Sequence, residues 1–264
     1  MTEVELILPH DNENRLGTNS DLPTAKRGLA WMFFLLSLFF ISAVAYAAIY
    51  GVHLAITQPG LVQSGDKEVL GSMVTDHLIS YSDSMLGLSL VHLLFLLPAL
   101  MLISNFKHQS FKITLALRGF DRSVLIKAII LFGIYLVMAI LVDEFLVDGV
   151  DDFILQINGT HSLGVAFSIV ILAPIYEELL FRGYFFKVLR STRLGSSGTI
   201  LITSVLFLAL HLGQYQWPIM VSLFMFSCLL GYLREKSGSV FLPMLFHGLN
   251  NLVSAVLIVY LGLA

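Results

Sequence analysis

Long apolar runs, separated by shorter polar or charged segments, make up most of the chain. They lie at residues 28–56, 86–104, 123–147, 163–190, 198–213, 217–234 and 239–263. A helix needs about 20 apolar residues to cross roughly 30 Å of hydrocarbon, and most of these runs are long enough. The fifth run is short, and the seventh contains Pro243, where it could divide. The pattern therefore predicts an all-α, polytopic membrane helix bundle of seven transmembrane helices, or eight if the last run divides.

The composition supports a membrane protein over a soluble one. Of the 264 residues, 57% are hydrophobic and 12% are charged, whereas soluble domains carry about 25% charged residues. The lipid bilayer is therefore the expected surrounding. No block of basic residues indicates a nucleic-acid partner, and a single cysteine, Cys228, excludes a disulfide within the chain.

The charges between the apolar runs predict the orientation. Basic residues gather on alternate connections, whereas the segment 57–85 has only Lys67 and the segment 148–162 has no Lys or Arg. By the positive-inside rule this predicts a multi-pass protein of the inner (plasma) membrane with a cytoplasmic N-terminus. The polar, acidic residues 1–27 are expected to form a disordered cytoplasmic tail, and residues 28–264 the membrane domain.

The connection at 105–122 mixes basic and apolar side chains. Such a segment could lie along the cytoplasmic membrane interface. An ordinary basic loop is the favoured interpretation.

Three charged residues, Glu177, Glu178 and Arg182, lie inside the fourth apolar run. Each charge at that depth costs roughly 2.5–3.5 kcal/mol or more, so the group needs mutual pairing or a function. On a helix Glu178 can pair with Arg182, whereas Glu177 is turned about 100° away. Glu177 is then free to act as a general base, and Pro174 one turn earlier can bend the helix and admit water beside it.

Polar side chains also lie in two later apolar runs. His211 follows Phe207 by four residues, and Asn251 follows His247 by four, so each pair shares a helix face. A carboxylate and an imidazole can hold and deprotonate a water, and His and Asn can donate to a developing oxyanion. Together with Glu177 these groups suit acyl hydrolysis. Counted along the helices, however, His211 lies about 20 Å from the cytoplasmic side and His247 about 12 Å, so a shared pocket requires tilt or displaced helix starts.

Other hydrolytic chemistries lack their sequence signatures. The chain has no G-x-S-x-G elbow for a serine nucleophile, and Cys228 has no basic neighbour in sequence. The H-E-x-x-H pattern of zinc peptidases is also absent.

With these motifs the chain resembles the CPBP family of intramembrane proteases. This family joins type 2 CAAX prenyl endopeptidases with bacteriocin-processing and immunity (ABI-like) proteins. The matching motifs are Glu177-Glu178-x-x-x-Arg182, Phe207-x-x-x-His211 and His247-x-x-x-Asn251, with Pro243-Met244-Leu245-Phe246 leading into the last. The resemblance covers roughly residues 163–264, the expected catalytic core.

The resemblance implies a glutamate-type mechanism. Glu177 and His211 would activate the attacking water, and His247 and Asn251 would stabilise the oxyanion, while three supporting residues would shape the site. The supporting residues are Glu178, Arg182 and Phe207. No cofactor is expected, because Asn251 has a role in the metal-free mechanism, but Glu177, His211 and His247 could instead hold zinc, as in a metalloendopeptidase.

Three function classes follow from these observations. The preferred one is an intramembrane endopeptidase that cuts a membrane-associated or lipidated protein or peptide. The alternative is a non-proteolytic immunity, protective or export-assisting protein on the same scaffold. A proton-coupled transporter is a third class, disfavoured because the sequence shows no inverted repeat.

Overall fold

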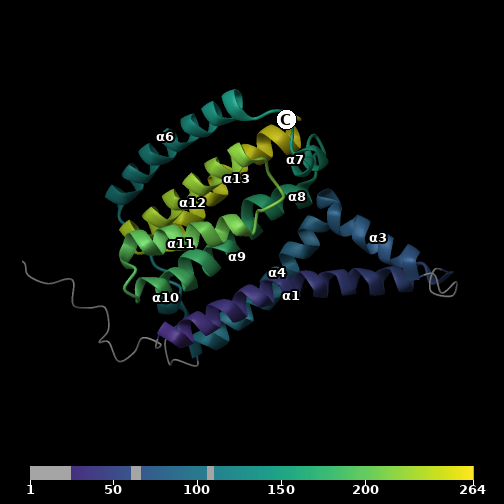
Figure 1. Ribbon diagram of the computed structural model, residues 1–264, viewed down its shortest axis with the longest axis horizontal. Coiled ribbons are helices and arrows are strands. Elements are labelled where there is room, and N and C mark those ends of the chain that lie inside the picture. Colours follow the sequence, from purple (N-terminus) through teal and green to yellow (C-terminus); the bar gives the residue numbers. More distant parts are fainter. Residues whose placement is uncertain (1–24, 61–66, 106–109, 264) are drawn as a thin grey trace, which may run out of the picture.

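The computed structural model describes residues 25–60, 67–105 and 110–263, and all the regular elements in these ranges are helices (Figure 1). The predicted tail lies outside the described residues up to residue 24, and α1 begins at Ala25. In chain order the elements are α1 (Ala25–Thr57), α3 (Lys67–Ile79), α4 (Tyr81–Asn105), α5 (Phe111–Thr114), α6 (Arg122–Leu146), α7 (Asp152–Ile157), α8 (Leu163–Phe167), η2 (Ser168–Leu172), α9 (Ala173–Glu178), η3 (Leu179–Phe185), α10 (Phe186–Arg190), α11 (Gly195–Ala209), α12 (Trp217–Ser237), α13 (Phe241–Ser254) and η4 (Ala255–Tyr260).

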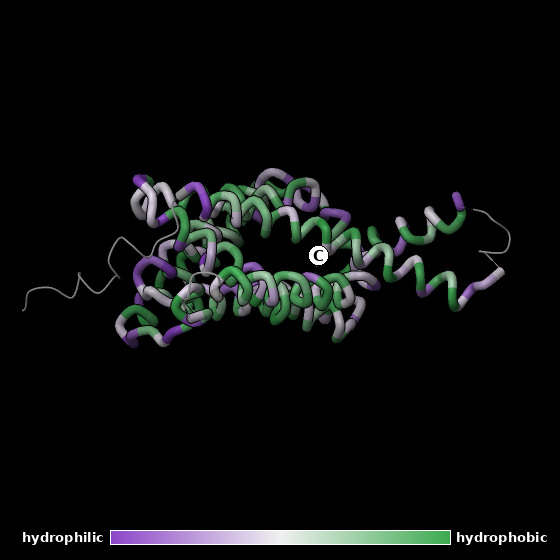
Figure 2. Tube along the Cα trace, turned by 90° about the horizontal axis from the view of Figure 1, so that it is seen from below, coloured by the Kyte–Doolittle hydropathy of each residue, from purple (hydrophilic) through white to green (hydrophobic). Residues whose placement is uncertain are grey.

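The helices confirm the predicted polytopic bundle. Within the described residues, six helices are long and apolar enough to cross a membrane. They are Lys26–Thr57, Tyr81–Ser104, Arg122–Leu146, Leu163–Arg190, Trp217–Ser237 and Phe241–Tyr260. The predicted fifth segment corresponds to α11, whose 15 residues span only about 22 Å. Figure 2 shows hydrophobic residues along the long helices and hydrophilic residues concentrated near their ends.

Pro243 does not divide the last membrane helix. It is the third residue of α13, and the helical segment continues without interruption to Tyr260. Proline is tolerated in the first turn because the backbone N–H groups there have no partner within the helix. The alternative of eight membrane helices is therefore not realised.

Three clusters of buried apolar side chains hold the bundle together. The largest joins α1 and α4 to the helix Leu163–Arg190 and to α11. A second joins α6, α12 and α13, and a third joins α7, α8 and η4 near the C-terminus. In Figure 1, α6 lies along one edge of the bundle, where it packs against α12.

The helix Leu163–Arg190 contains two π-helical segments, η2 and η3, on either side of α9. A π segment widens the helix by an extra residue in each turn and is frequently found at functional sites. The Glu-Glu-x-x-x-Arg motif crosses from α9 into η3. The sequence predicts a bend at Pro174, whereas the irregularity consists of π turns on both sides of that residue.

The connection before α6 is not an ordinary loop in its described part. After the short helix α5, Leu115 is fully buried in the largest apolar cluster. Arg118 then donates from Nε to the carbonyl of Gly238 at 2.7 Å, and Val240 donates its N–H to the carbonyl of Ala116 at 3.1 Å. These bonds fasten the segment to the turn between α12 and α13, so the favoured interpretation as a basic loop was wrong for residues 110–118.

Replacing Leu115 with alanine should lower the free energy of unfolding by about 2–5 kcal/mol, because the change leaves a cavity in the core. Chemical unfolding in detergent micelles, followed by circular dichroism, measures this difference. Ile113→Ala is the matched control, since Ile113 is 68% exposed and its loss should have little effect. Equal effects of the two changes would contradict the insertion of this segment into the core.

Candidate active site

The predicted charged residues meet in the interior of the bundle. Glu178 and Arg182 are fully buried, and Glu177 and His247 are 9% and 4% exposed. The glutamates and the arginine come from the helix Leu163–Arg190, and His247 comes from α13. The motifs are far apart in the sequence, so their convergence depends on the packing of α13 against η2 and α9.

Arg182 is the most fully engaged group of the site. Its Nη1 contacts Oε1 of Glu178 at 2.8 Å, as the helical spacing predicted. Its Nη2 donates to the backbone carbonyl of Ser227 at 2.8 Å and to the Ser227 Oγ at 2.6 Å. The guanidinium carbon lies 5.0 Å from the centre of the Phe207 ring, within the range of a cation–π contact. An ion pair buried to this extent is tolerable only with such additional partners.

Glu178 also binds His247, a contact that the sequence analysis did not predict. The Nδ1 atom of His247 lies 2.9 Å from Oε1 of Glu178, the same oxygen that accepts from Arg182. An ionised carboxylate can only accept, so Nδ1 carries the proton and donates it. The Nε2 atom of His247 then faces Glu177, 3.7 Å from Oε2. Glu178 is therefore more than the neutralised partner of Arg182, since it also orients this ring.

His211 follows the last turn of α11, and its ring is oriented by a backbone group. Its Nδ1 lies 2.9 Å from the carbonyl oxygen of Phe207. A carbonyl can only accept, so Nδ1 again carries the proton and Nε2 is left as an acceptor. The two predicted histidines therefore share one tautomer, in which Nε2 of the neutral ring can take a proton.

Phe207 lies between the two histidines. Its ring centre is 4.7 Å from that of His211 and 5.8 Å from that of His247. Glu177 interacts electrostatically with both imidazoles. Glu177, His211 and His247 therefore lie near one another in the structure. His211 and His247 were counted at different depths along their helices, so α11 and α13 must differ in depth or tilt.

Asn251 has a structural partner in the neighbouring helix. Its Nδ2 donates to the carbonyl oxygen of Ile169 at 2.9 Å. In a π-helix a carbonyl accepts from the residue five positions later, which for Ile169 is Pro174, a residue with no N–H. Asn251 supplies the missing donor, and Gly248 lets the helices approach, because a Cβ there would lie 3.1 Å from the Val170 carbonyl. One of the two N–H groups of Asn251 is thus committed to helix packing.

The described side chains do not by themselves form a metal centre. No three His, Cys, Asp or Glu side chains in the described ranges lie close enough to share one ion. The zinc alternative would require Glu177, His211 and His247 to move closer together. Because Glu178 engages Nδ1 of His247, Nε2 would be the ligand atom of that ring.

Ser227 and Tyr215 also contribute to the site, and the sequence analysis missed both. Ser227 is a fully buried hydroxyl in an apolar helix, which is the only signal that marks it. Tyr215 lies in the connection between α11 and α12, and its ring is stacked 6.3 Å from that of His211. Burial raises the pKa of the Tyr215 hydroxyl above its ordinary value, and the charges of Glu177 and Asp151 raise it further. Tyr215 is therefore a neutral hydroxyl at the rim of the site.

Comparison with known proteins identifies the same part of the chain as the one that contains the candidate site. Residues 159–253 match the family described as type II CAAX prenyl endopeptidase Rce1-like. The match contains all the predicted site residues and confirms the resemblance. An uncharacterized 24.3 kDa protein of Escherichia coli is 42% identical over 82 residues, which are 30% of this chain and 37% of that protein. No solved structure matches the chain significantly.

Replacing Arg182 with methionine should lower the free energy of unfolding by about 3–5 kcal/mol, because Glu178 would lose its buried cationic partner. Denaturant titration in micelles measures the loss. The control is Arg190→Met on the same membrane helix, since Arg190 pairs with Glu235 at 3.1 Å but its side chain is 47% exposed. That change should lower the free energy of unfolding by about 1 kcal/mol or less. Equal losses in the two variants would contradict a larger contribution of the buried ion pair to stability.

Proposed function

We propose that this protein is an intramembrane endopeptidase that hydrolyses a peptide bond of a membrane-associated or lipidated protein or peptide. The family match supports a protease of the CAAX type in general and a substrate in or near the membrane. We infer the glutamate mechanism from the geometry of the site, and the class of substrate from the resemblance of the motifs.

In the proposed reaction a water molecule lies beside Glu177 and Nε2 of His211. Glu177 takes a proton from this water as its oxygen attacks the carbonyl carbon of the scissile bond. His247, once its Nε2 has taken a proton, and the remaining N–H of Asn251 donate to the oxyanion that forms. Glu177 then returns the proton to the amide nitrogen as the C–N bond breaks, which leaves a carboxylic acid and an amine.

The observation that carries this proposal is the contact between Nε2 of His247 and Oε2 of Glu177 at 3.7 Å. Glu178 and Arg182 neutralise each other, so Glu177 remains as the carboxylate with no cation bound directly to it among the described residues. A carboxylate and two imidazoles held by their Nδ1 atoms in the interior of the bundle are suited to polarise one water molecule.

Loss of the proposed base should abolish cleavage. Purified protein in liposomes is incubated with a library of lipidated and membrane-spanning peptides, and mass spectrometry identifies the cut bonds. Glu177→Gln and His211→Ala should each reduce the rate about 10²–10⁴-fold, as expected for loss of general base catalysis. His53→Ala, which changes an exposed histidine far along the sequence, should cleave at the wild-type rate.

Two outcomes would contradict parts of this account. If both active-site variants still cleave, or if wild type cuts nothing while Glu177→Gln preserves a cellular phenotype, the non-proteolytic alternative is favoured. If treatment with 1,10-phenanthroline stops cleavage and zinc restores it, the metal-free mechanism is wrong although the peptidase assignment stands.

We further propose that the protein lies in the inner (plasma) membrane with its N-terminus in the cytoplasm, because the basic residues gather on alternate connections. In a Cys228→Ser background, a cysteine at Lys236 should be labelled only from the cytoplasmic side by a membrane-impermeant maleimide. A cysteine at Lys67 should be labelled only from the opposite side. The reverse pattern would overturn this orientation.

A further inference from the structure

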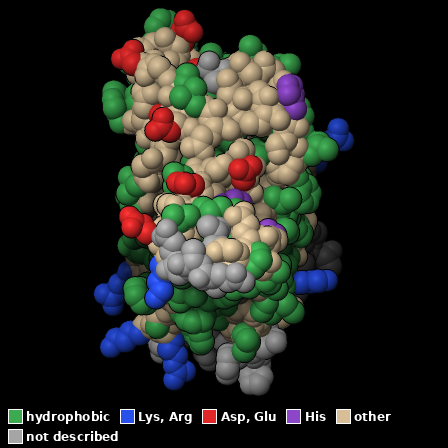
Figure 3. All heavy atoms as spheres, turned by 90° about the vertical axis from the view of Figure 1, so that its right-hand side faces the viewer, with side chains coloured by type: hydrophobic (Ala, Val, Ile, Leu, Met, Phe, Trp, Pro, Cys, Tyr) green, Lys and Arg blue, Asp and Glu red, His purple; other side chains and the backbone are tan. Residues whose placement is uncertain are grey.

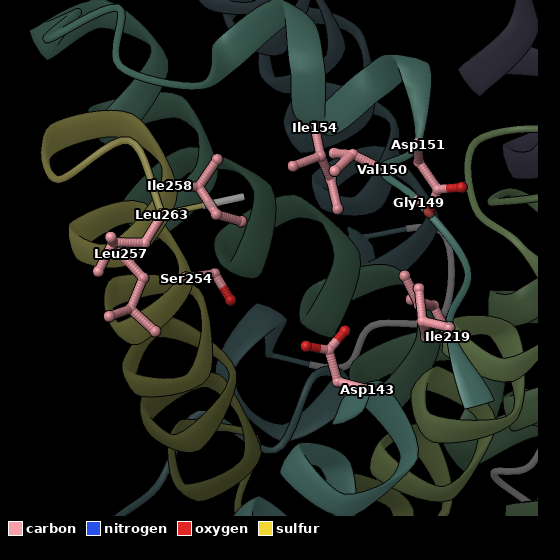
Figure 4. Close-up of a pocket in the computed structure, with 11 residues that line it drawn as sticks. Asp143, Gly149, Val150, Asp151, Ile154, Ile219, Ser254, Leu257, Ile258 and Leu263 are labelled. Carbon is pink, nitrogen blue, oxygen red and sulfur yellow. The ribbon is translucent and has the colours of Figure 1, made fainter. Parts of the chain in front are cut away.

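A cavity of about 270 Å³ lies where α6 ends, beside the start of α12 and the end of α13 (Figure 4). Most of its lining is aliphatic, and the polar side chains that line it are two aspartates and one serine. The lining residues are Asp143, Val147, Gly149, Val150, Asp151, Ile154, Ile219, Ser254, Leu257, Ile258 and Leu263. Figure 4 shows the Asp143 and Ser254 side chains directed into the space that the aliphatic side chains surround. A cavity of this size holds one side chain rather than a whole ligand.

The two carboxylates of the cavity have no cationic partner among the residues that the structure describes. Asp151 is only 8% exposed, its Oδ1 accepts from the Gln216 N–H at 3.0 Å, and its Oδ2 has no hydrogen-bond partner among the described residues. Asp143 is exposed, and no ion pair of either aspartate occurs within the described ranges. A buried carboxylate oxygen without a partner is costly, so a cation brought by a ligand would be favoured here.

The surrounding chain cannot supply that cation locally. The sequence contains no Lys or Arg between Lys127 and Arg182, and none between Arg193 and Arg234. Figure 3 views the end of the molecule that lies at the right of Figure 1 and shows acidic side chains gathered on its upper half. The excess of carboxylates on this part of the surface favours positively charged groups from outside the chain.

The cavity is connected to the candidate active site along α13. His247, Asn251 and Ser254 are spaced by four and three residues, so they share one face of the helix. Seven residues of helix rise about 10 Å, which equals about three residues of an extended peptide. The chain at Tyr215 and Gln216 provides a second connection, because the Tyr215 ring stacks 6.3 Å from that of His211 and the Gln216 N–H donates to Oδ1 of Asp151 at 3.0 Å.

The lining indicates the chemistry of the ligand. Lysine and arginine have a long aliphatic stem that ends in a cation, and such side chains place the stem against apolar groups and the charge near carboxylates. A hard metal ion instead takes six to eight oxygen ligands, as Ca²⁺ does, and the cavity offers two carboxylates and a hydroxyl among aliphatic groups.

We propose that this cavity binds a lysine or arginine side chain of the peptide substrate, about three residues from the scissile bond. This inference rests on the proposed endopeptidase function and adds a specificity to it. Asp143 supplies the accessible charge, and the aliphatic side chains hold the stem.

Binding to an inactive enzyme tests the cavity without cleavage. Glu177→Gln protein in liposomes is titrated with two fluorescent apolar peptides that differ only in one position, lysine in one and glutamine in the other. The lysine peptide should bind about tenfold more tightly, and a further Asp143→Asn change should remove this advantage. Glu144→Gln, which removes a neighbouring exposed charge outside the cavity, is the matched control and should preserve it.

Cleavage provides the second measurement. Substrates of the active enzyme should carry a basic residue about three positions from the cut, and Asp143→Lys should shift the preference to an acidic residue there. Asp143 is exposed, so these variants should fold, and thermal unfolding checks that they do.

The outcomes separate the two proposals. Lysine-dependent binding without any cleavage would support the cavity and contradict the peptidase. Cleavage that depends on Glu177 but shows no preference for a basic residue, and no effect of Asp143→Asn, would overturn the cavity proposal alone. A lysine advantage that disappears when EDTA is added would also overturn it, because the cavity would then hold a metal ion.

Discussion

The buried chain of contacts from Arg182 through Glu178 to His247 is the interaction on which the site depends. Two charges and an imidazole are removed from water in an apolar bundle, which is costly unless each has several partners. One oxygen of Glu178 accepts from both Arg182 and His247, and Ser227 binds the other arm of the guanidinium. This arrangement fixes the His247 ring and directs its Nε2 at Glu177. Glu177 is left as the carboxylate that we propose to act as the base.

The irregular backbone of the helix Leu163–Arg190 places these groups. The π turns on both sides of α9 free backbone carbonyls that a regular helix would satisfy. The Asn251 amide bonds one of these carbonyls, that of Ile169, and Gly248 allows the close approach that this bond requires. The motif that contains Asn251 is therefore joined to the helix Leu163–Arg190 by a hydrogen bond and by close packing. Asn251, which we propose to donate to the oxyanion, therefore also holds these two helices together.

Much of the fold could be predicted from the sequence, because lipid demands long apolar runs and tolerates few charges. The same constraint identified Glu177, Glu178 and Arg182, since buried charges are conspicuous in such runs. Local spacing could not predict contacts between helices. The bond from His247 to Glu178, the role of Ser227 and the insertion of Leu115 all depend on which helices pack together. The π turns also leave no simple pattern in the sequence.

The tautomer of His247 tests the central claim most directly. In protein labelled with ¹⁵N at histidine, the ring signals of His247, assigned by their loss in His247→Gln, report which nitrogen carries the proton. The account predicts a proton on Nδ1 and none on Nε2 in the neutral ring, with this preference lost in Glu178→Ala. A neutral ring protonated on Nε2, or a tautomer unaffected by the loss of Glu178, would contradict it.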